Sequence, residues 1–274
     1  SSVEVTSVCV DGQKKIRRSF VFDVANEVSN LKEELVDDRV PLETEVKLKN
    51  IRSDFQNRRS VDVESIAEVI FKHFLLLYVL GVVPAIFVHD GETKKNVNEI
   101  YTELLVGGTQ TVDKFKIGDN EFELLQQKFN IPSTNKLSSG VYLCAGQRVV
   151  EKRKKGIDPR INETLTDADG NRFLYVGLVK GEYLDAHVNP TRQTIVFPDR
   201  DLSEEDSDEL CFDCVETELI QCVNKKVSSY LKDEFANLSA QSSKRLTHFV
   251  DDIAPEFKGF VNRCGGDLFV SSDK

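Results

Sequence analysis

The feature that most constrains the fold is an alternation of strand-like and helix-like segments that continues to about residue 199. Val141–Ala145 and Phe173–Val179 are short, almost wholly apolar runs, as expected of buried strands. Apolar residues at helical spacing follow a cap at Ser60 or Asp62 and continue to Leu80. An alternation of this kind favours a mixed α/β sandwich, of class α+β.

Turn signals and polar segments divide the rest of this region. Asp11-Gly12 lies between two strand-like runs, residues 3–10 and 14–24, and predicts a β-hairpin. Residues 26–36 predict a polar helix, and residues 37–59 are weakly periodic and predict irregular structure with some strand. The further elements expected are a strand at 84–89, a helix at 96–105 and a strand pair at 115–122.

The last part of the chain has a helical pattern. Ser203 followed by acidic residues predicts a helix start, and apolar residues then recur every three or four positions, Cys211 and Cys214 among them. A second helix is expected over residues 237–253, before Pro255. We therefore expect an α/β domain at 1–200, either whole or as subdomains 1–110 and 111–200, and a helical tail at 201–274.

Charge and hydropathy restrict the class of protein. The net charge of −10 argues against a general nucleic-acid coat, which would be basic. No signal peptide opens the sequence, and the longest apolar run, residues 74–88, is too short for a membrane span. We expect a soluble, cytoplasmic protein that has no membrane partner. Its six cysteines fit reduced thiols better than a disulfide framework.

Motifs for metal or nucleotide binding are absent or weak. Cys211-Phe-Asp-Cys214 has zinc or redox spacing, but it has no second pair of ligands and follows the apolar stripe of the predicted helix. Thr166–Gly170 resembles part of a calcium loop without the closing glutamate, and we interpret it as a turn. No phosphate-binding glycine loop occurs. The sequence therefore predicts neither a metal site nor a nucleotide pocket.

Two groups of basic residues are candidates for binding. Asn189-Pro190-Thr191-Arg192 predicts a stiff turn between two extended arms, with one guanidinium at its tip that suits a phosphate. The alternative is a solvated surface arginine. The densest basic patch comprises Arg148, Lys152, Arg153, Lys154 and Lys155, and it fits either a nucleic-acid contact or a solvated loop.

The stretch Leu184–Phe197 resembles the second-domain motif of the GHKL ATPase superfamily, which includes gyrase-B-type topoisomerases, heat-shock chaperones and MutL proteins. The MutL form of the motif, VDVNVHPTKxEVRF, matches in register, and its lysine corresponds to Arg192. Val141–Val149 is similar to the strand that precedes this loop in MutL. Residues 73–100 are similar to bacterial chaperone-like members. The resemblance covers about residues 60–200.

The resemblance implies a transducer, or middle, region with a two-layer, ribosomal-protein-like β-α-β fold. Arg192 would sense the γ-phosphate of ATP, with Asn189, Thr191 and Gln193 around it. ATP and Mg would be held mainly by an N-terminal ATPase domain, because the nucleotide-binding motifs of the superfamily are not in this sequence. This fragment would therefore be inactive alone, although part of an ATP-hydrolysing protein, and a homodimer is compatible with this view.

The alternative is a non-enzymatic α/β module that binds nucleic acid or protein through the basic patch. An independent enzyme would need a catalytic constellation, and none is evident in the sequence.

Overall fold

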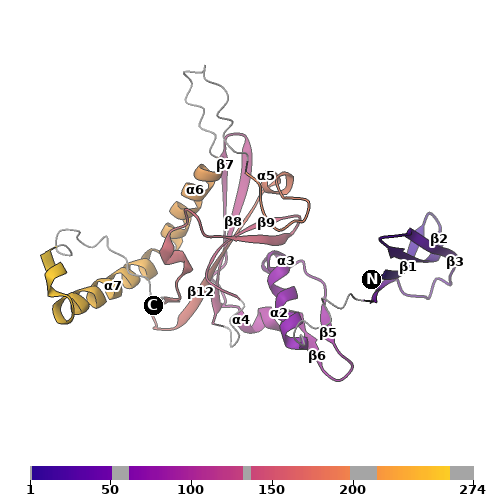
Figure 1. Ribbon diagram of the computed structural model, residues 1–274, viewed down its shortest axis with the longest axis horizontal. Helices are drawn as coiled ribbons and strands as arrows, with labels where there is room; N and C mark the ends of the chain where they lie inside the picture. The colour runs from indigo at the N-terminus through magenta and orange to yellow at the C-terminus, as the bar shows by residue number, and fades with distance from the viewer. Residues whose placement is uncertain (1, 51–61, 132–136, 198–214, 260–274) are drawn as a thin grey trace, which may run out of the picture. The chain divides into compact units, whose positions relative to one another are not determined.

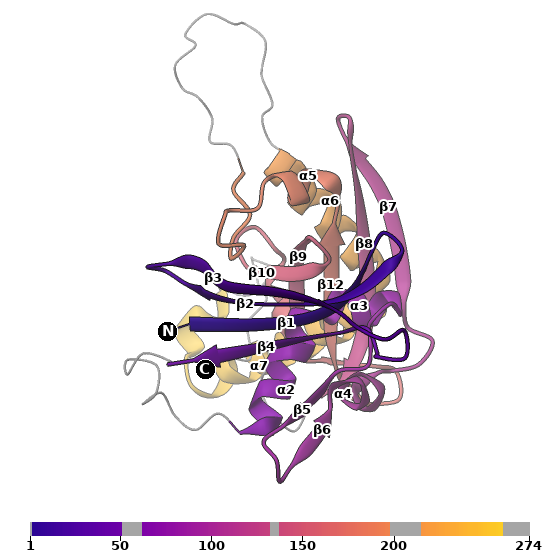
Figure 2. The same ribbon diagram turned by 90° about the vertical axis from the view of Figure 1, so that its right-hand side faces the viewer.

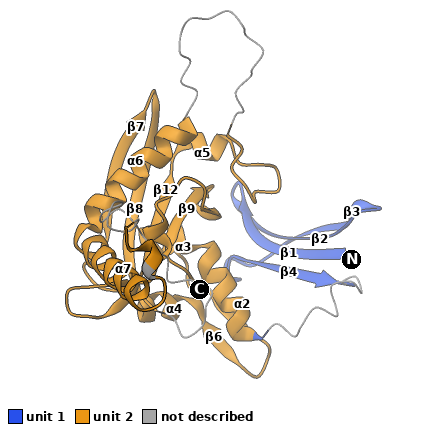
Figure 3. Ribbon diagram, turned by 60° about the vertical axis from the view of Figure 1, so that its left-hand side comes forward, with its two compact units in different colours: residues 1–62 blue, residues 63–274 orange. Residues whose placement is uncertain are grey.

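The computed structural model describes residues 2–50, 62–131, 137–197 and 215–259, and the chain divides into two compact units (Figure 3). Unit 1 is Ser1–Asp62 and unit 2 is Val63–Lys274. This division differs from the boundaries expected at residues 110 and 200. The C-terminal helices belong to the same unit as the larger sheet, because their apolar residues pack against it.

Unit 1 is an antiparallel sheet with the strand order β3-β2-β1-β4 (Figure 2). Its turn at Gly12, where φ is 63°, confirms the predicted hairpin. The strands are β1 (Ser2–Asp11), β2 (Lys14–Asp23), β3 (Glu27–Leu35) and β4 (Glu43–Lys49).

The predicted polar helix at residues 26–36 is wrong, because this segment forms strand β3. Leucine, lysine and glutamate favour a helix locally, but pairing with β2 overrides that preference. Two ion pairs to β2 support the strand, Arg17–Glu34 at 2.6 Å and Arg18–Glu33 at 2.5 Å. Asn30, with a φ of 55°, lies at an irregularity in the register.

Unit 2 is built on a mixed sheet with the strand order β10-β9-β12-β8-β7, in which β11 also pairs with β12. The long central strand β12 runs parallel to β9 and antiparallel to β8. The predicted strand pair around Gly118 is confirmed, although it is longer than expected. The strands are β7 (Thr111–Ile117), β8 (Asn120–Asn130), β9 (Gly140–Ala145), β10 (Arg148–Arg153), β11 (Leu165–Thr166) and β12 (Arg172–Lys180).

Helices cover both faces of this sheet (Figure 1). Along β12, Tyr175 belongs to the core on one face and Val176 to the core on the other. The mixed α/β class is confirmed, but the unit has three layers rather than two. One face carries α2 (Val63–His73), α3 (Leu75–Leu80) and α4 (Val97–Leu104), and the other carries α5 (Glu182–Ala186), α6 (Val215–Tyr230) and the start of α7 (Lys232–Asp252).

The third layer follows from the composition of β12. This strand is apolar at nearly every position, so each face needs a cover. Leu219, Val223 and Val227 of α6 provide part of that cover on one face and are at most 2% exposed. The predicted helical appendage is therefore a structural layer of unit 2.

Several boundaries differ from the predictions in detail. The helix expected to run to Leu80 is divided at Phe74 into α2 and α3, and the second C-terminal helix begins at Lys232. The predicted helix start at Ser203 and the Cys211–Cys214 motif lie outside the described residues. The remaining elements are the short strands β5 (Phe87–His89) and β6 (Lys94–Asn96) and two 3-10 turns, η1 (Pro159–Asn162) and η2 (Pro255–Phe257). No helix in the described part of the chain is both long and apolar enough to cross a membrane.

Candidate functional site

The turn at Asn189 is held by its own side chain. Asn189 Oδ1 accepts hydrogen bonds from the backbone N–H groups of Gln193, at 2.8 Å, and Thr194, at 3.3 Å. Its backbone N–H donates to the Thr194 carbonyl at 3.0 Å. The hydroxyl of Thr191 makes no such bond to a described residue. The first arm is not extended as expected, since Glu182–Ala186 forms helix α5.

Arg192 lies in this turn with a φ of 54°, a left-handed conformation that is uncommon for arginine. Its backbone N–H donates to the Asn189 carbonyl at 2.8 Å, which holds the residue in the turn. The side chain is exposed, and it has no ion pair with a described residue. Among the described residues, no carboxylate pairs with this positive charge, and the backbone that carries it is hydrogen-bonded in place.

The guanidinium of Arg192 lies against the β9–β10 turn. A β-carbon placed on Gly146 would lie 2.9 Å from Arg192 Nη1, which shows how closely the guanidinium approaches the backbone of this turn. Gly146 and Gln147 have left-handed φ values of 56° and 65°. The Gly146 N–H donates to Asp185 Oδ1 of α5 at 2.8 Å, which joins α5 to the turn beneath the guanidinium.

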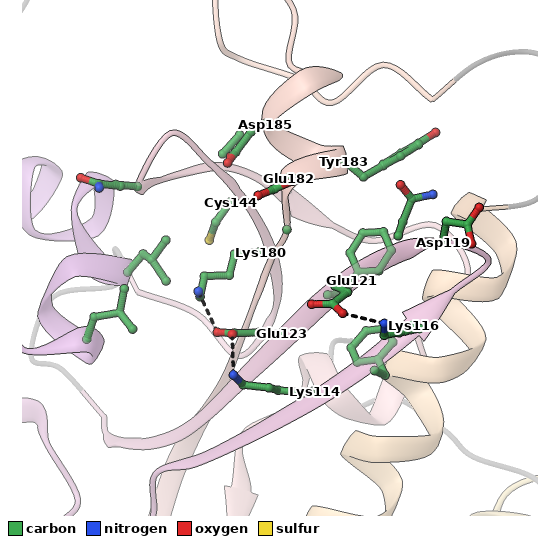
Figure 4. A pocket seen from close by; sticks show the side chains of 18 residues that line it. Lys114, Lys116, Asp119, Glu121, Glu123, Cys144, Lys180, Glu182, Tyr183 and Asp185 are labelled. Carbon is green, nitrogen blue, oxygen red and sulfur yellow. Dashed lines mark ion pairs between the residues drawn. The ribbon is translucent and has the colours of Figure 1, made fainter.

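A groove of about 900 Å³ opens beside this turn. It lies where the parallel strands β9 and β12 both end, beside the tip of the β7–β8 hairpin (Figure 4). Ala145 and Gln147, on either side of Gly146, both line it, so Arg192 lies at its rim. Leu76, Phe115, Phe122 and Tyr183 supply much of its apolar lining.

The groove itself is not suited to a triphosphate. Its three lysines are all paired with glutamates across the hairpin and β12 (Figure 4). Asp119, Glu182 and Asp185 add further negative charge that no lysine of the groove balances. The pairs are Lys180–Glu123 at 2.7 Å, Lys114–Glu123 at 3.3 Å and Lys116–Glu121 at 2.7 Å. The hydrogen bond from Lys180 is the main cause of the lowered pKa of Glu123.

No nucleophile or metal centre is apparent at this site. Cys144 lines the groove, but burial raises the pKa of its thiol, which disfavours the reactive thiolate. In the part of the chain that the structure describes, no group of three or more His, Cys, Asp or Glu residues is arranged to hold a metal ion. The calcium-like segment is a turn, as predicted, in which Asp167 Oδ1 accepts from the N–H groups of Asp169 and Asn171 at 3.0 and 2.8 Å.

The predicted basic patch does not form one continuous face. Lys152 and Arg153 are neighbours on strand β10, so their side chains point to opposite faces of the sheet. Arg153 forms ion pairs with Glu216 of α6 and with Glu151, and its guanidinium lies 5.6 Å from the Phe197 ring. Of the five predicted residues, Lys154 and Lys155 are exposed, whereas Arg148, Lys152 and Arg153 are half-buried.

Sequence reasoning singled out Arg192 but missed the residues beneath it. Asp185 lies inside the recognised motif, yet nothing in its sequence context indicates that its carboxylate binds a turn 39 positions earlier. Gly146 was noted only as part of the preceding strand. Its role depends on the close approach of Arg192, which only the tertiary structure shows.

No protein-family model matches this chain, and no curated protein matches it. Among solved structures, the chain is similar to the 43K ATPase domain of Thermus thermophilus gyrase B, crystallised in complex with an aminocoumarin. The similarity covers 89% of this chain and 71% of that chain, at 13% sequence identity and a TM-score of 0.34. A structural similarity this weak does not establish a shared fold or function.

Proposed function

We propose that this chain is the transducer region of a GHKL-type, heat-shock-chaperone-like ATPase. In this proposal Arg192 contacts the γ-phosphate of a Mg-bound ATP that another domain of the protein holds. The proposal is supported by the sequence motif at 184–197 and by one structural observation. Arg192 is exposed, is not ion-paired with any described residue, and lies in a turn that its own hydrogen bonds stabilise.

Recognition of the γ-phosphate by this region requires a cation held in a fixed position, and it does not require a nucleotide pocket in this region. ADP lacks the γ-phosphate, so a guanidinium placed there distinguishes ATP from ADP. A hydrogen bond to a charged group contributes about 1.5–3 kcal/mol. That free energy is enough to favour the closed arrangement of two domains when ATP is bound. It also stabilises charge that develops on the transferring phosphoryl group.

The neighbours of Arg192 have supporting roles in this proposal. Asn189 holds the backbone of the turn, and Thr191 and Gln193 are the neighbours of Arg192 in the sequence of the turn. The acidic groove beside the turn would repel the remaining phosphates, so ATP is expected to reach only the tip of the turn. The nucleotide-binding groups and the metal ligands are assigned to the partner domain, and a homodimer stays compatible with the proposal.

The test is ATP hydrolysis by protein that contains both the ATPase domain and this region. We expect Arg192→Ala to lower turnover by about 10- to 100-fold, which corresponds to loss of about 1.5–3 kcal/mol. ATP affinity should change little, and Arg192→Lys should retain part of the activity. Arg172→Ala is the matched control, because Arg172 is also exposed but begins β12 at the end away from the groove. Unchanged turnover in Arg192→Ala would rule out this role.

A further inference from the structure

The groove beside the turn of Arg192 has the size and the position of a ligand site. Its volume of about 900 Å³ lies within the range of about 300–1,000 Å³ that is usual for pockets that hold small molecules. It opens beyond the carboxyl ends of the parallel strands β9 and β12, and ligands commonly bind at this edge of an α/β sheet. All of its lining residues belong to unit 2, so the groove lies within one compact unit.

Part of the groove lining is apolar. Leu76 and Leu80 of α3 contribute to it, and Leu80 is 40% exposed. The rings of Phe115 and Phe122 stack with their centres 5.7 Å apart, and the ring of Tyr183 lies 6.1 Å from that of Phe122. Apolar surface is stabilised when a ligand removes it from water, and an aromatic ring also attracts an ammonium group. This lining therefore favours a ligand with a hydrocarbon body.

The charged part of the lining carries an excess of carboxylates. Five carboxylates and three lysines line the groove, which gives it a formal charge of −2. The lysines are all paired with Glu121 or Glu123. The other three acidic residues, Asp119, Glu182 and Asp185, form no ion pair with a described residue. Glu182 and Asp185 lie on α5, whereas Asp119 lies on the β7–β8 hairpin, so this negative charge comes from two separate elements (Figure 4).

We propose that the groove binds a small diamine or polyamine, in which two or more ammonium groups are joined by a hydrocarbon chain. The ammonium groups pair with Glu182 on α5 and with Asp119 on the hairpin, and the chain covers Leu80 and the aromatic rings. A single ammonium group would leave one of the two acidic elements without a partner. An inorganic dication would leave the apolar lining in water. The site belongs to this chain alone and does not depend on the proposed ATPase function.

The site can be tested with spermidine and cadaverine. Isothermal titration calorimetry on the whole chain, at constant ionic strength in chloride buffer, should detect binding of each amine with a Kd below about 1 mM. Pentanediol has the same chain length as cadaverine but no charge, and it should give no binding heat. Mg²⁺ at the same concentration as the amine should displace little of it, because the ion has no hydrocarbon chain to cover the apolar lining.

Substitutions test the charged and apolar parts of the site separately. Glu182→Gln and Asp119→Asn should each weaken spermidine binding by about threefold, and the double variant by about tenfold, as expected of ion pairs that stay in contact with water. Leu80→Ser should also weaken binding. Glu218→Gln is the matched control, because Glu218 is an exposed acid in the first turn of α6, as Glu182 is in α5, but does not line the groove. Arg192→Gln should not weaken amine binding, which separates this site from the proposed ATP contact.

The acidic variants should keep the wild-type urea midpoint, since Asp119 and Glu182 are both exposed, so a loss of binding is not a loss of the fold. Absence of binding heat with both amines, or displacement of spermidine by an equal concentration of Mg²⁺, would overturn the proposal. Equal losses in Glu182→Gln and Glu218→Gln would also overturn it. The net charge of −10 on the whole chain would then account for the attraction.

Discussion

The ion pair between Lys128 of β8 and Glu234 of α7 gives a direct test of whether the C-terminal helices belong to the fold of unit 2. The two charged atoms are 2.5 Å apart, and the side chains are 17% and 12% exposed. The Lys128 ammonium also lies 4.8 Å from the centre of the Phe173 ring and 5.4 Å from that of Tyr230. Removal of the carboxylate charge would leave a largely buried ammonium with only aromatic faces as partners.

The expected cost can be estimated from these contacts. Removing one partner of a buried ion pair costs about 3–5 kcal/mol. The remaining exposure of Lys128 and its two aromatic neighbours reduce that cost, because a cation over an aromatic ring retains about 1–2 kcal/mol. We therefore expect Glu234→Gln to destabilise unit 2 by about 2–4 kcal/mol. Its melting temperature would fall by about 4–16 °C, at roughly 2–4 °C for each kcal/mol in a domain of this size.

The assay is urea and thermal denaturation followed by circular dichroism. Asp233→Asn is the neighbouring control, since Asp233 is exposed, and its loss should cost at most about 1 kcal/mol through the helix dipole. The double variant Lys128→Met with Glu234→Leu should recover most of the stability, because it leaves no buried charge. If Glu234→Gln unfolds at the wild-type urea concentration, α7 is not packed against the sheet as described here.

Two other predictions concern the turn and a titrating histidine. Asn189→Ala removes the acceptor of two backbone hydrogen bonds, and it should destabilise the turn by about 1–2 kcal/mol. It should also lower ATP turnover without affecting nucleotide affinity, and turnover equal to wild type would contradict the role given to the turn. Burial and the charge of Arg148 lower the pKa of His73 below its ordinary value of 6.5. Stability should therefore decline as the pH falls through about 6.5, where the unfolded chain takes up a proton first, and His73→Gln should show a smaller decline in pH-dependent denaturation.

The parts of the fold that local chemistry decides were predicted correctly. The Asp11-Gly12 hairpin and the Asn189 turn depend on interactions between residues close in the sequence, and the apolar runs at 141–145 and 173–179 are visible in the sequence although their partner strands are not. Residues that favour a left-handed φ indicate turns, and runs of apolar side chains indicate buried strands. Both signals can be recognised in a short stretch of sequence without knowledge of the rest of the fold. Arg192 was singled out because it lies in such a turn, although its functional role stays a prediction.

Residues 26–36 show where local preference was insufficient. Their composition favours a helix, but β2 offers backbone hydrogen bonds and two arginines that pair with Glu33 and Glu34. The basic patch is a similar case, since strand alternation sends Lys152 and Arg153 to opposite faces, and Arg153 pairs with Glu216 on one of them. Charge density along the sequence does not reveal which charges are already neutralised in space.

The sequence by itself determined the mixed α/β class, the main hairpins and the turn that carries Arg192, because these depend on periodicity and turn chemistry over a few residues. Tertiary structure alone decided that α6 and α7 form a layer of the sheet domain, that Gly146 and Asp185 lie beneath Arg192, and that Arg153 pairs with Glu216 of α6. Each of these features joins residues far apart in the chain. Such pairings depend on how the strands order themselves in the sheet, and that order is a property of the packed domain as a whole.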